Sequence, residues 1–262
     1  MLWIGGPPAA GKTSVATRLA RRHGLRWYNA DTQTWRHRDR ALADGNEAAR
    51  RWEALTPEER MRVPTAEMLG MWLHPERGPM VVDDVRRLPA SPLVVAEGTT
   101  VPAWVVSDGV AAPGQSIWLM PTPSFHLAQL SRHPPGARAL YLALAELIGR
   151  EVAEHGAPAL TADESRGLGE MLEAAEELFS ESLARGPRAE TASERRALLR
   201  EANEAIVNQV LGYYARPWAE GDAGEVRRAF VCECGDPACD EDVETTVAAV
   251  SRAPVLARGH EV

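Results

Sequence analysis

The sequence predicts an α/β protein built on a parallel sheet with helices on both of its faces. Over the first 185 residues, short apolar runs alternate with longer segments of helical periodicity, and this alternation is typical of such sheets. Polar residues follow three of the apolar runs, near the strand ends where open α/β sheets bind their ligands. These residues are Lys12, Asp31 and Glu97.

Apolar runs bounded by turn residues predict five short strands. They cover residues 1–4, 25–30, 93–96, 116–120 and, as the weakest signal, 157–161. Helical periodicity fills most of the intervals between them. We expect helices over residues 14–23, 47–55, 65–73, 80–88, 125–130, 139–155 and 165–184, with a further helix start at 56–59. Residues 32–44 form a polar segment, and residues 132–138 form a basic break rich in proline and glycine.

The glycine loop between the first strand and the first helix has the spacing G-x-x-x-x-G-K-T of the phosphate-binding P-loop, or Walker A motif. Gly6 and Gly11 permit a polyphosphate to approach the backbone, and the helix start adds its N–H groups and positive dipole end. We expect Lys12 to reach the β- and γ-phosphates and Thr13 to bind Mg²⁺. The predicted nucleotide-binding residues are Gly6, Pro7, Pro8, Ala9, Ala10, Gly11, Lys12, Thr13 and Ser14.

Composition argues against several other classes of protein. The chain has 262 residues, of which 45% are hydrophobic, enough to build a core. A net charge of −8 argues against a nucleic-acid-binding surface. No run approaches the roughly 18 apolar residues of a membrane span. Because an apolar strand begins at the first residue, we expect no signal peptide, a cytoplasmic location and reduced cysteines.

The first 185 residues resemble the P-loop small-molecule kinases, the family of shikimate kinase, gluconate kinase and chloramphenicol phosphotransferase. The resemblance rests on GPPAAGKT at residues 6–13, on Asp31, on VVAEG at 94–98 and on IWLMPTPSFHLAQLSR at 117–132. It implies a five-stranded parallel sheet in strand order 2-3-1-4-5 with a mobile lid. It also implies phosphorylation of a hydroxyl group on a small molecule, with ATP or GTP and Mg²⁺ as cofactors.

The same resemblance implies roles for single residues. Asp31 matches the acidic residue that contacts the substrate hydroxyl and often serves as its base. Glu97 and Gly98 occupy the site beside the substrate, or beside Mg²⁺ through water. Arg132 and Arg138 match the lid arginines that reach the transferring phosphate. The chain departs from the family pattern because Glu97 stands where an aspartate is usual, and because the long segment from residue 36 to residue 73 matches no known substrate signature.

Charged residues outside these motifs are expected to be structural. Arg36, Arg38 and Arg40 are interpreted as a solvated face, with contact to an anionic substrate as the alternative. Asp83 and Asp84 are interpreted as exposed carboxylates on the helix expected over 80–88.

A second module is expected over residues 186–262, with a helix over 193–214 followed by a cysteine cluster. The candidate ligands are Cys232, Cys234, Cys239 and His260. Three thiolates and one imidazole suit a closed, structural zinc site, and such a cluster in a cytosolic chain favours metal over disulfide. The alternatives are reduced cysteines packed as small hydrophobic residues, or a redox switch between Cys232 and Cys234. The module resembles a Cys-rich module of actinobacterial proteins, for which the resemblance implies no activity.

Two functions are consistent with these features. The first is an NTP-dependent kinase that phosphorylates a small molecule, including an antibiotic or another natural product, with Asp31 as the base. The second is a nucleotide-binding regulatory protein whose zinc module contacts a partner. The structural alternatives are a helix N-cap or a solvated loop charge for Asp31, and a cap or a structural ion pair for Glu97. The acceptor, the choice between ATP and GTP and the oligomeric state do not follow from the sequence.

Overall fold

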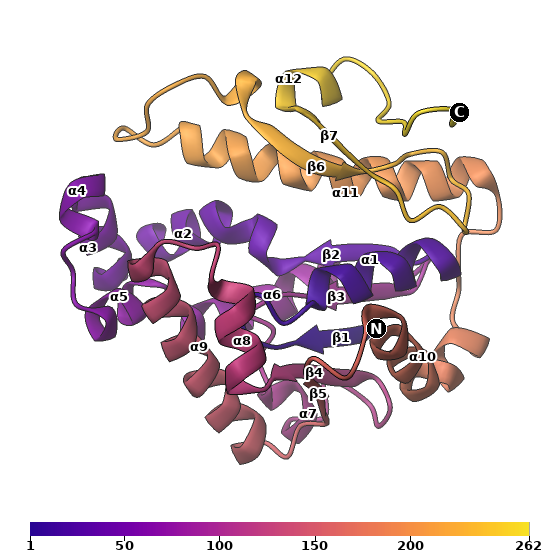
Figure 1. The fold of residues 1–262 in the computed structure, drawn as a ribbon, viewed down its shortest axis with the longest axis horizontal. Coiled ribbons are helices and arrows are strands. Elements are labelled where there is room, and N and C mark those ends of the chain that lie inside the picture. The colour runs from indigo at the N-terminus through magenta and orange to yellow at the C-terminus, as the bar shows by residue number, and fades with distance from the viewer. Residues whose placement is uncertain (262) are drawn as a thin grey trace.

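A computed structural model describes residues 1–261 and contains a five-stranded sheet in the order β2-β3-β1-β4-β5, with all neighbouring strands parallel (Figure 1). The strands are β1 (Leu2–Gly5), β2 (Arg26–Asn29), β3 (Val94–Glu97), β4 (Ser116–Pro121) and β5 (Ala159–Ala162). The predicted fold class and strand order are therefore confirmed. The weak signal at 157–161 is a real edge strand that pairs with β4.

Helices cover both faces of this sheet. On one face lie α1 (Lys12–His23) and α10 (Leu168–Arg185), and on the other lie α6 (His74–Arg87), α7 (Trp104–Ser107) and α9 (Pro135–Glu154). The alternation of side chains along each strand supplies the two cores separately, because successive residues point to opposite faces. Each layer of helices thus has its own apolar cluster against the sheet.

Strand β1 shows this division within three residues. Leu2 and Ile4 are buried against α1 and α10, whereas Trp3, between them, is buried in the opposite core. All three side chains are fully inaccessible to solvent. A strand buried on both faces is continuously apolar, which is why it is recognisable from so short a run.

The remaining helices of the first module lie at one end of the sheet. They are the 3-10 helix η1 (Ala30–Gln33), α2 (Thr34–Ala43), α3 (Glu47–Ala54), α4 (Pro57–Arg60), α5 (Thr65–Met71) and α8 (Pro123–Leu130). Helix α2 forms where the sequence indicated only a polar segment. It buries His37, Arg38 and Ala41, so its inward face is largely polar and lacks the apolar periodicity that marks a helix. Helix α6 begins at His74, six residues before the expected start.

The C-terminal residues form a smaller module above the β2 edge of the sheet (Figure 1). It consists of α11 (Ala192–Tyr214), the 3-10 helix η2 (Ala223–Glu225), the antiparallel strands β6 (Arg227–Val231) and β7 (Asp242–Thr246), and α12 (Val247–Val250). Its own apolar core is centred on Phe230. Helix α11 packs against β2, η1 and α2. Within residues 1–261, no helix is long and apolar enough to cross a membrane.

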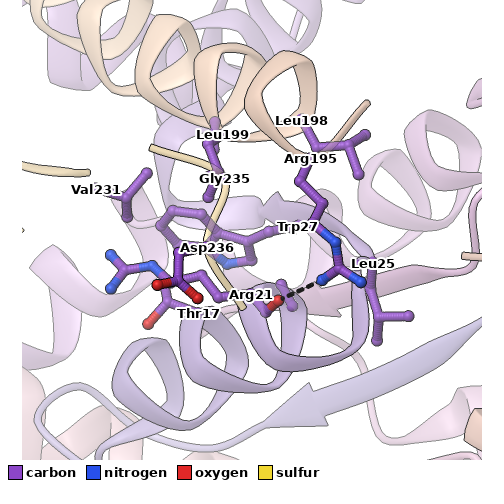
Figure 2. A pocket seen from close by; sticks show the side chains of 13 residues that line it. Thr17, Arg21, Leu25, Trp27, Arg195, Leu198, Leu199, Val231, Gly235 and Asp236 are labelled. Carbon is purple, nitrogen blue, oxygen red and sulfur yellow. Dashed lines mark hydrogen bonds between the residues drawn. The ribbon is translucent and has the colours of Figure 1, made fainter. Parts of the chain in front are cut away.

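A closely packed seam joins the module to the sheet. Asn203 is buried and its side chain exchanges two hydrogen bonds of 2.9 Å with the backbone of Val231, which ties α11 to β6. Arg195 donates to the carbonyl of Arg21 on α1 at 3.1 Å, as Figure 2 shows. The cavity in this seam measures only about 20 Å³. Since one water molecule needs about that much space, the seam is a packing interface and no ligand site.

Candidate functional site

The carboxyl ends of β1, β2 and β3 lie side by side. Glu97, the last residue of β3, is in register with Ile4 of β1 and with Asn29 of β2. The P-loop follows β1 and η1 follows β2, so both start beside Glu97. This is the edge at which open α/β sheets bind ligands, and it brings the regions of Lys12, Asp31 and Glu97 together.

The P-loop is held from both sides. Gly6 has φ of +135°, and a Cβ there would stand 2.3 Å from the carbonyl oxygen of Leu119, so a glycine is required. On the opposite side, Nε2 of His126 donates to the carbonyl of Pro8 at 2.8 Å, which anchors the loop to α8. Burial lowers the pKa of His126 and keeps its ring neutral. Sequence reasoning missed His126, because a histidine 118 residues away carries no local signal.

Lys12 is the first residue of α1 and is buried. Its Nζ donates to the carbonyl of Pro7 at 2.7 Å. Burial lowers the pKa of Lys12, while the charges of Asp31 and Glu97 act in the opposite direction. The ammonium group therefore lies near both predicted carboxylates. Gly11 at the N-cap has no side chain to satisfy the first N–H groups of α1, and such a helix start is suited to a phosphate.

Glu97 is fully buried and accepts a hydrogen bond of 3.0 Å at Oε1 from the hydroxyl of Thr13. Its second oxygen, Oε2, has no hydrogen-bond partner among the described residues. Burial, together with the nearby charge of Asp31, raises the pKa of Glu97 to about 7, against the opposing effects of Lys12, Thr13 and the indole of Trp27, which lies near this carboxylate without a hydrogen bond of good geometry. The site thus contains a carboxylate that is half satisfied, next to the threonine hydroxyl of the P-loop.

Asp31 projects its carboxylate toward β3 and is not the cap of a helix. The cap of η1 is Asn29, whose side chain accepts from the backbone N–H groups of Asp31 and Thr32. The backbone N–H and the hydroxyl of Thr99 donate to the Asp31 carboxylate at 3.2–3.3 Å. Gly98 allows this approach, since it has φ of +148° and a Cβ there would lie 2.7 Å from that of Ala30.

Arg77 of α6 holds the backbone of the loop that carries Asp31. It is 2% exposed, and its Nη2 donates to the carbonyl of Ala30 at 2.9 Å. Its Nε lies 3.4 Å from Nδ1 of His37. Burial lowers the pKa of Arg77, and the charge of Asp31 opposes this shift. Sequence reasoning missed Arg77, because the expected helix began only at residue 80.

The prediction that Asp84 is exposed is wrong. It is buried and accepts from the Tyr28 hydroxyl at 3.0 Å, from Nε2 of His37 at 2.8 Å and from Arg40 at 3.2 Å, and it also pairs with Arg36. Burial alone would raise its pKa, but these donors and charges hold the pKa at about 2. Asp84 therefore joins β2, α2 and α6 beneath the Asp31 loop.

The solvated arginine face predicted from the sequence holds for Arg36 alone. Its side chain is 57% exposed although it pairs with Asp84, whereas Arg40 is half-buried against the same carboxylate and Arg38 is only 4% exposed. Asp83 is half exposed and pairs with Arg40 at 3.4 Å. Buried arginines on a helix look the same in sequence as exposed ones, because the pairing carboxylate lies on another helix.

The two predicted lid arginines lie at the junction of α8 and α9. Arg132 is exposed in the loop between α8 and α9, and Arg138 is half-buried in the first turn of α9. Neither forms an ion pair within the described part of the chain. Nearby, the rings of His133 and Tyr141 pack edge to face with centroids 5.3 Å apart.

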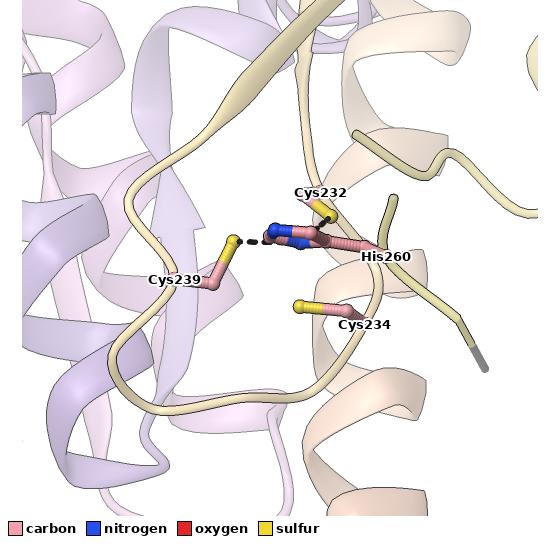
Figure 3. Close-up of side chains that lie close together, drawn as sticks. All are labelled: Cys232, Cys234, Cys239 and His260. Atoms are coloured by element: carbon pink, nitrogen blue, oxygen red, sulfur yellow. Dashed lines mark hydrogen bonds between the residues drawn. The ribbon is translucent and has the colours of Figure 1, made fainter. Parts of the chain in front are cut away.

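The three cysteines and His260 form a cluster in the C-terminal module (Figure 3). One ligand atom from each lies within 4.8 Å of all the others. Nδ1 of His260 is 3.4 Å from the sulfur of Cys232 and 3.6 Å from that of Cys239. Tetrahedral zinc, with bonds of about 2.3 Å to sulfur and about 2.1 Å to nitrogen, places such atoms about 3.6 Å apart. The cluster therefore has the dimensions of a zinc site.

The backbone around the cluster also suits thiolate ligands. The N–H of Ala257 donates to the sulfur of Cys232 at 3.3 Å. Burial would raise the pKa of Cys232, but the backbone N–H groups of Ala257 and Cys234 lower it overall. At Cys239, burial raises the pKa to about 12, a shift that a bound cation would reverse. Backbone N–H groups that donate to a ligand atom in this way orient and stabilise metal-bound sulfur.

Comparison with known proteins identifies only distant likenesses. No model of a known protein family matches the chain, and no curated protein matches it by sequence. The structure of TT1252 from Thermus thermophilus is similar at a TM-score of 0.44 and 18% identity, over 69% of this chain and 96% of that one. Shikimate kinase from Acinetobacter baumannii, solved in complex with shikimate, is similar at a TM-score of 0.37 and 18% identity, over 70% and 92%. Neither likeness enters the functional conclusion, which rests on the site.

Proposed function

We propose that this protein is an NTP-dependent kinase that transfers a phosphoryl group to a hydroxyl group of a small molecule. The observation that carries the proposal is the meeting of the P-loop residues Lys12 and Thr13 with two carboxylates, Glu97 and Asp31, at one sheet edge. A site that only binds a nucleotide has no need of a second carboxylate that neither caps a helix nor pairs with an arginine or lysine. Asp31 is such a carboxylate.

The chain's own residues would divide the work of phosphoryl transfer. The P-loop and the N-terminus of α1 would hold the polyphosphate, with Lys12 neutralising charge on the transferred group. Asp31 would orient the acceptor hydroxyl and take its proton as the oxygen bonds to the γ-phosphorus and the bond to the β-phosphate oxygen breaks. The products are the phosphate ester, the nucleoside diphosphate and one proton. Arg132 and Arg138 would approach the phosphate from the lid.

The residues present fit a magnesium ion. Thr13 and Glu97 supply oxygen ligands, which Mg²⁺ prefers, and Oε2 of Glu97 lacks any other partner among the described residues. When bound, the ion would neutralise negative charge on the phosphates. Thr13 is exposed, so its hydroxyl is accessible to a nucleotide-bound cation.

Phosphoryl transfer from ATP and from GTP to a panel of hydroxylated small molecules, antibiotics included, tests this proposal. We expect Asp31→Asn to lower kcat by about 10²- to 10⁴-fold, the usual contribution of a general base, with nucleotide affinity unchanged. Lys12→Ala should abolish both nucleotide binding and turnover. Asp44→Asn, an exposed carboxylate at the end of α2, is the matched control and should be silent.

Two results would contradict the kinase proposal. One is tight nucleotide binding with no turnover toward any acceptor, which would favour the regulatory function. The other is acceptor turnover that Asp31→Asn leaves intact.

We also propose that Cys232, Cys234, Cys239 and His260 bind one structural zinc ion. The distances within the cluster and the N–H donor on Cys232 support this proposal. With four protein ligands the site is closed, so the metal would brace the module and take no part in the reaction.

A further inference from the structure

A cavity of about 280 Å³ lies between α2 to α6 and the C-terminal end of α11. Four of the eight tryptophans line it, together with Tyr213. The four are Trp35, Trp52, Trp72 and Trp218. Trp35 packs against Tyr213 and Trp218 with ring centroids 5.6 and 5.9 Å apart, so both modules contribute to one aromatic wall. Aromatic side chains in a concave site favour flat, apolar ligands.

The same cavity is strongly cationic. Arg38, Arg60 and Arg77 line it. The guanidinium of Arg60 lies 4.6 Å from the ring centre of Trp52 and 3.8 Å from that of Trp218. Burial lowers the pKa of Arg38 to about 10, and the neighbouring arginines act in the same direction, yet the group remains charged at neutral pH. The negative charge of Glu53 acts on Arg38 and Arg60; its Oε2 accepts from Trp218 at 2.8 Å, and its Oε1 lies 3.6 Å from Arg216 with no hydrogen-bond partner within residues 1–261.

Several donors around the cavity have no acceptor. Arg38 uses Nη2 to donate to the carbonyl of Met71, but its Nε and Nη1 have no partner within residues 1–261. The indole N–H groups of Trp52 and Trp72 lack partners there too. Indole N–H groups without partners also occur away from the cavity, at Trp3, Trp27 and Trp118, so the guanidinium of Arg38 is the informative group. Buried charged donors are almost always hydrogen-bonded, and an anionic group beside Arg38 would be such a partner. An arginine retained merely to brace the helices would be expected to satisfy these groups within the protein.

The cavity borders the loop that carries Asp31. Thr34, which lines the cavity, donates its hydroxyl to the carbonyl of Asp31 at 2.7 Å. Arg77, also in the lining, donates to the carbonyl of Ala30. Tyr141, whose pKa burial raises with a contribution from the charge of Asp31, packs against Trp72 at 6.3 Å. A ligand in the cavity would therefore lie next to the backbone of the Asp31 loop, on the side of its carbonyl groups.

From these observations we infer that the cavity is the acceptor site and that the acceptor is a flat aromatic compound carrying a negatively charged group, which Arg38 recognises. The assignment of this ligand as the acceptor rests on the proposed kinase function. The binding chemistry of the cavity does not, since it follows from the aromatic walls and the unsatisfied donors. The C-terminal module, through Tyr213 and Trp218, would be part of the substrate site as well as a brace for the sheet.

Three probes, titrated by calorimetry and by tryptophan fluorescence without nucleotide, test the inference. They are 6-hydroxy-2-naphthoate, its neutral amide, and the alicyclic anion 4-hydroxycyclohexanecarboxylate. We expect the naphthoate to bind one site per chain, to quench the tryptophans, and to bind about tenfold or more tightly than either of the others. Arg38→Gln should remove most of the preference for naphthoate over amide.

Matched variants separate recognition from folding. Arg62→Gln removes an exposed charge from the same region and should leave all affinities unchanged. Trp72→Leu leaves Arg38 in place and should weaken naphthoate and amide alike. Equal binding of naphthoate and amide, an unaltered preference in folded Arg38→Gln protein, or no binding of any probe at millimolar concentration would overturn the inference. Because no turnover is measured, this result and that of the kinase assay can fail independently.

Discussion

At the scale of single residues, the site separates its carboxylates by their surroundings. Glu97 is fully buried, has one unsatisfied oxygen, and has a pKa raised to about 7 by burial. Asp31 receives two hydrogen bonds from Thr99. Asp84 is buried like Glu97, but four donors hold its pKa near 2. At Asp84 the donors and positive charges outweigh the effect of burial on the pKa, whereas at Glu97 burial outweighs them.

Asp84 should make stability depend on pH below neutrality. Its pKa is lowered from 3.8 to about 2 in the folded chain, so its contribution is complete above about pH 4 and is lost as the pH falls toward 2. The shift corresponds to about 2 kcal/mol, which solvent screening reduces to about 1–2 kcal/mol. We expect Asp84→Asn to lower the free energy of unfolding by about this amount at pH 7, as measured by urea denaturation.

The difference between the native chain and Asp84→Asn should shrink as the pH is lowered from 4 to 2, because the unfolded chain binds the proton first and the folded carboxylate follows only near pH 2. Asp83→Asn is the control, since that carboxylate is half exposed and has one long ion pair; we expect a change below about 0.5 kcal/mol. A difference between native and Asp84→Asn protein that stays constant over this pH range would contradict the assignment.

A site residue could be predicted from the sequence only where the residues that define its role are close neighbours in the chain. Lys12 and Thr13 were identifiable because the P-loop places its chemistry within eight consecutive residues. Arg77, His126 and Asp84 were not, because their partners lie between 40 and 118 residues away. Ion pairs between distant helices leave no periodicity in a single sequence, whereas strands buried on both faces do.

At the scale of elements, α11 is the helix that links the two modules. Gln209 donates to the carbonyl of Asp31 at 2.9 Å, and Arg216 pairs with Asp39 at 2.6 Å. The helix can approach α2 closely because Gly212 has no side chain: a Cβ there would lie 2.9 Å from the Cβ of Trp35. The extent of α11 was predictable from its helical pattern, but its contact with the Asp31 loop was not.

Adding one methyl group at Gly212 should therefore be unfavourable. Alanine ordinarily stabilises a helix by up to about 1 kcal/mol relative to glycine. At Gly212 we expect the clash with Trp35 to outweigh this gain and lower the free energy of unfolding. Gly149, in the middle of α9, is the matched control, because a Cβ there meets only Met120 at 3.7 Å. Gly149→Ala should stabilise the protein. Chemical denaturation of both variants measures whether each substitution raises or lowers the free energy of unfolding.

If Gly212→Ala were as stabilising as Gly149→Ala, the close packing of α11 on α2 would not constrain that position. The two variants carry the same substitution, glycine to alanine, and differ only in the side chain that the new methyl group contacts.

The cysteine cluster should hold one zinc ion per chain. Metal analysis of the purified protein is expected to give about one zinc, and Cys234→Ser should reduce this to a small fraction. Cobalt in place of zinc should show the visible absorption of a tetrahedral thiolate site. A folded native chain that carries no metal would refute the zinc proposal and leave the cysteines as packed, reduced side chains.

At the scale of the whole molecule, the cysteine cluster and the aromatic cavity are connected through one helix. The loop after β6 that carries Cys232 packs on α11 through Asn203, whose side chain also donates to Glu233 at 2.7 Å. The C-terminal end of the same helix carries Tyr213, which lines the cavity. The P-loop, by contrast, is anchored by α8 and β4 within the first module. Loss of the metal should therefore affect the two ligand sites unequally.

This connection predicts that removing zinc weakens the acceptor side and spares the nucleotide side. In folded Cys234→Ser protein we expect affinity for 6-hydroxy-2-naphthoate to fall several-fold, because α11 loses one of its supports and the Tyr213 wall loosens. Affinity for a non-hydrolysable ATP analogue should change by less than about twofold, since the residues proposed to bind it lie in the P-loop and the first turn of α1. Titration of both ligands into the same protein sample measures the two effects. An equal loss of both affinities would instead indicate general unfolding, and no loss of either would show that the sheet alone shapes the cavity.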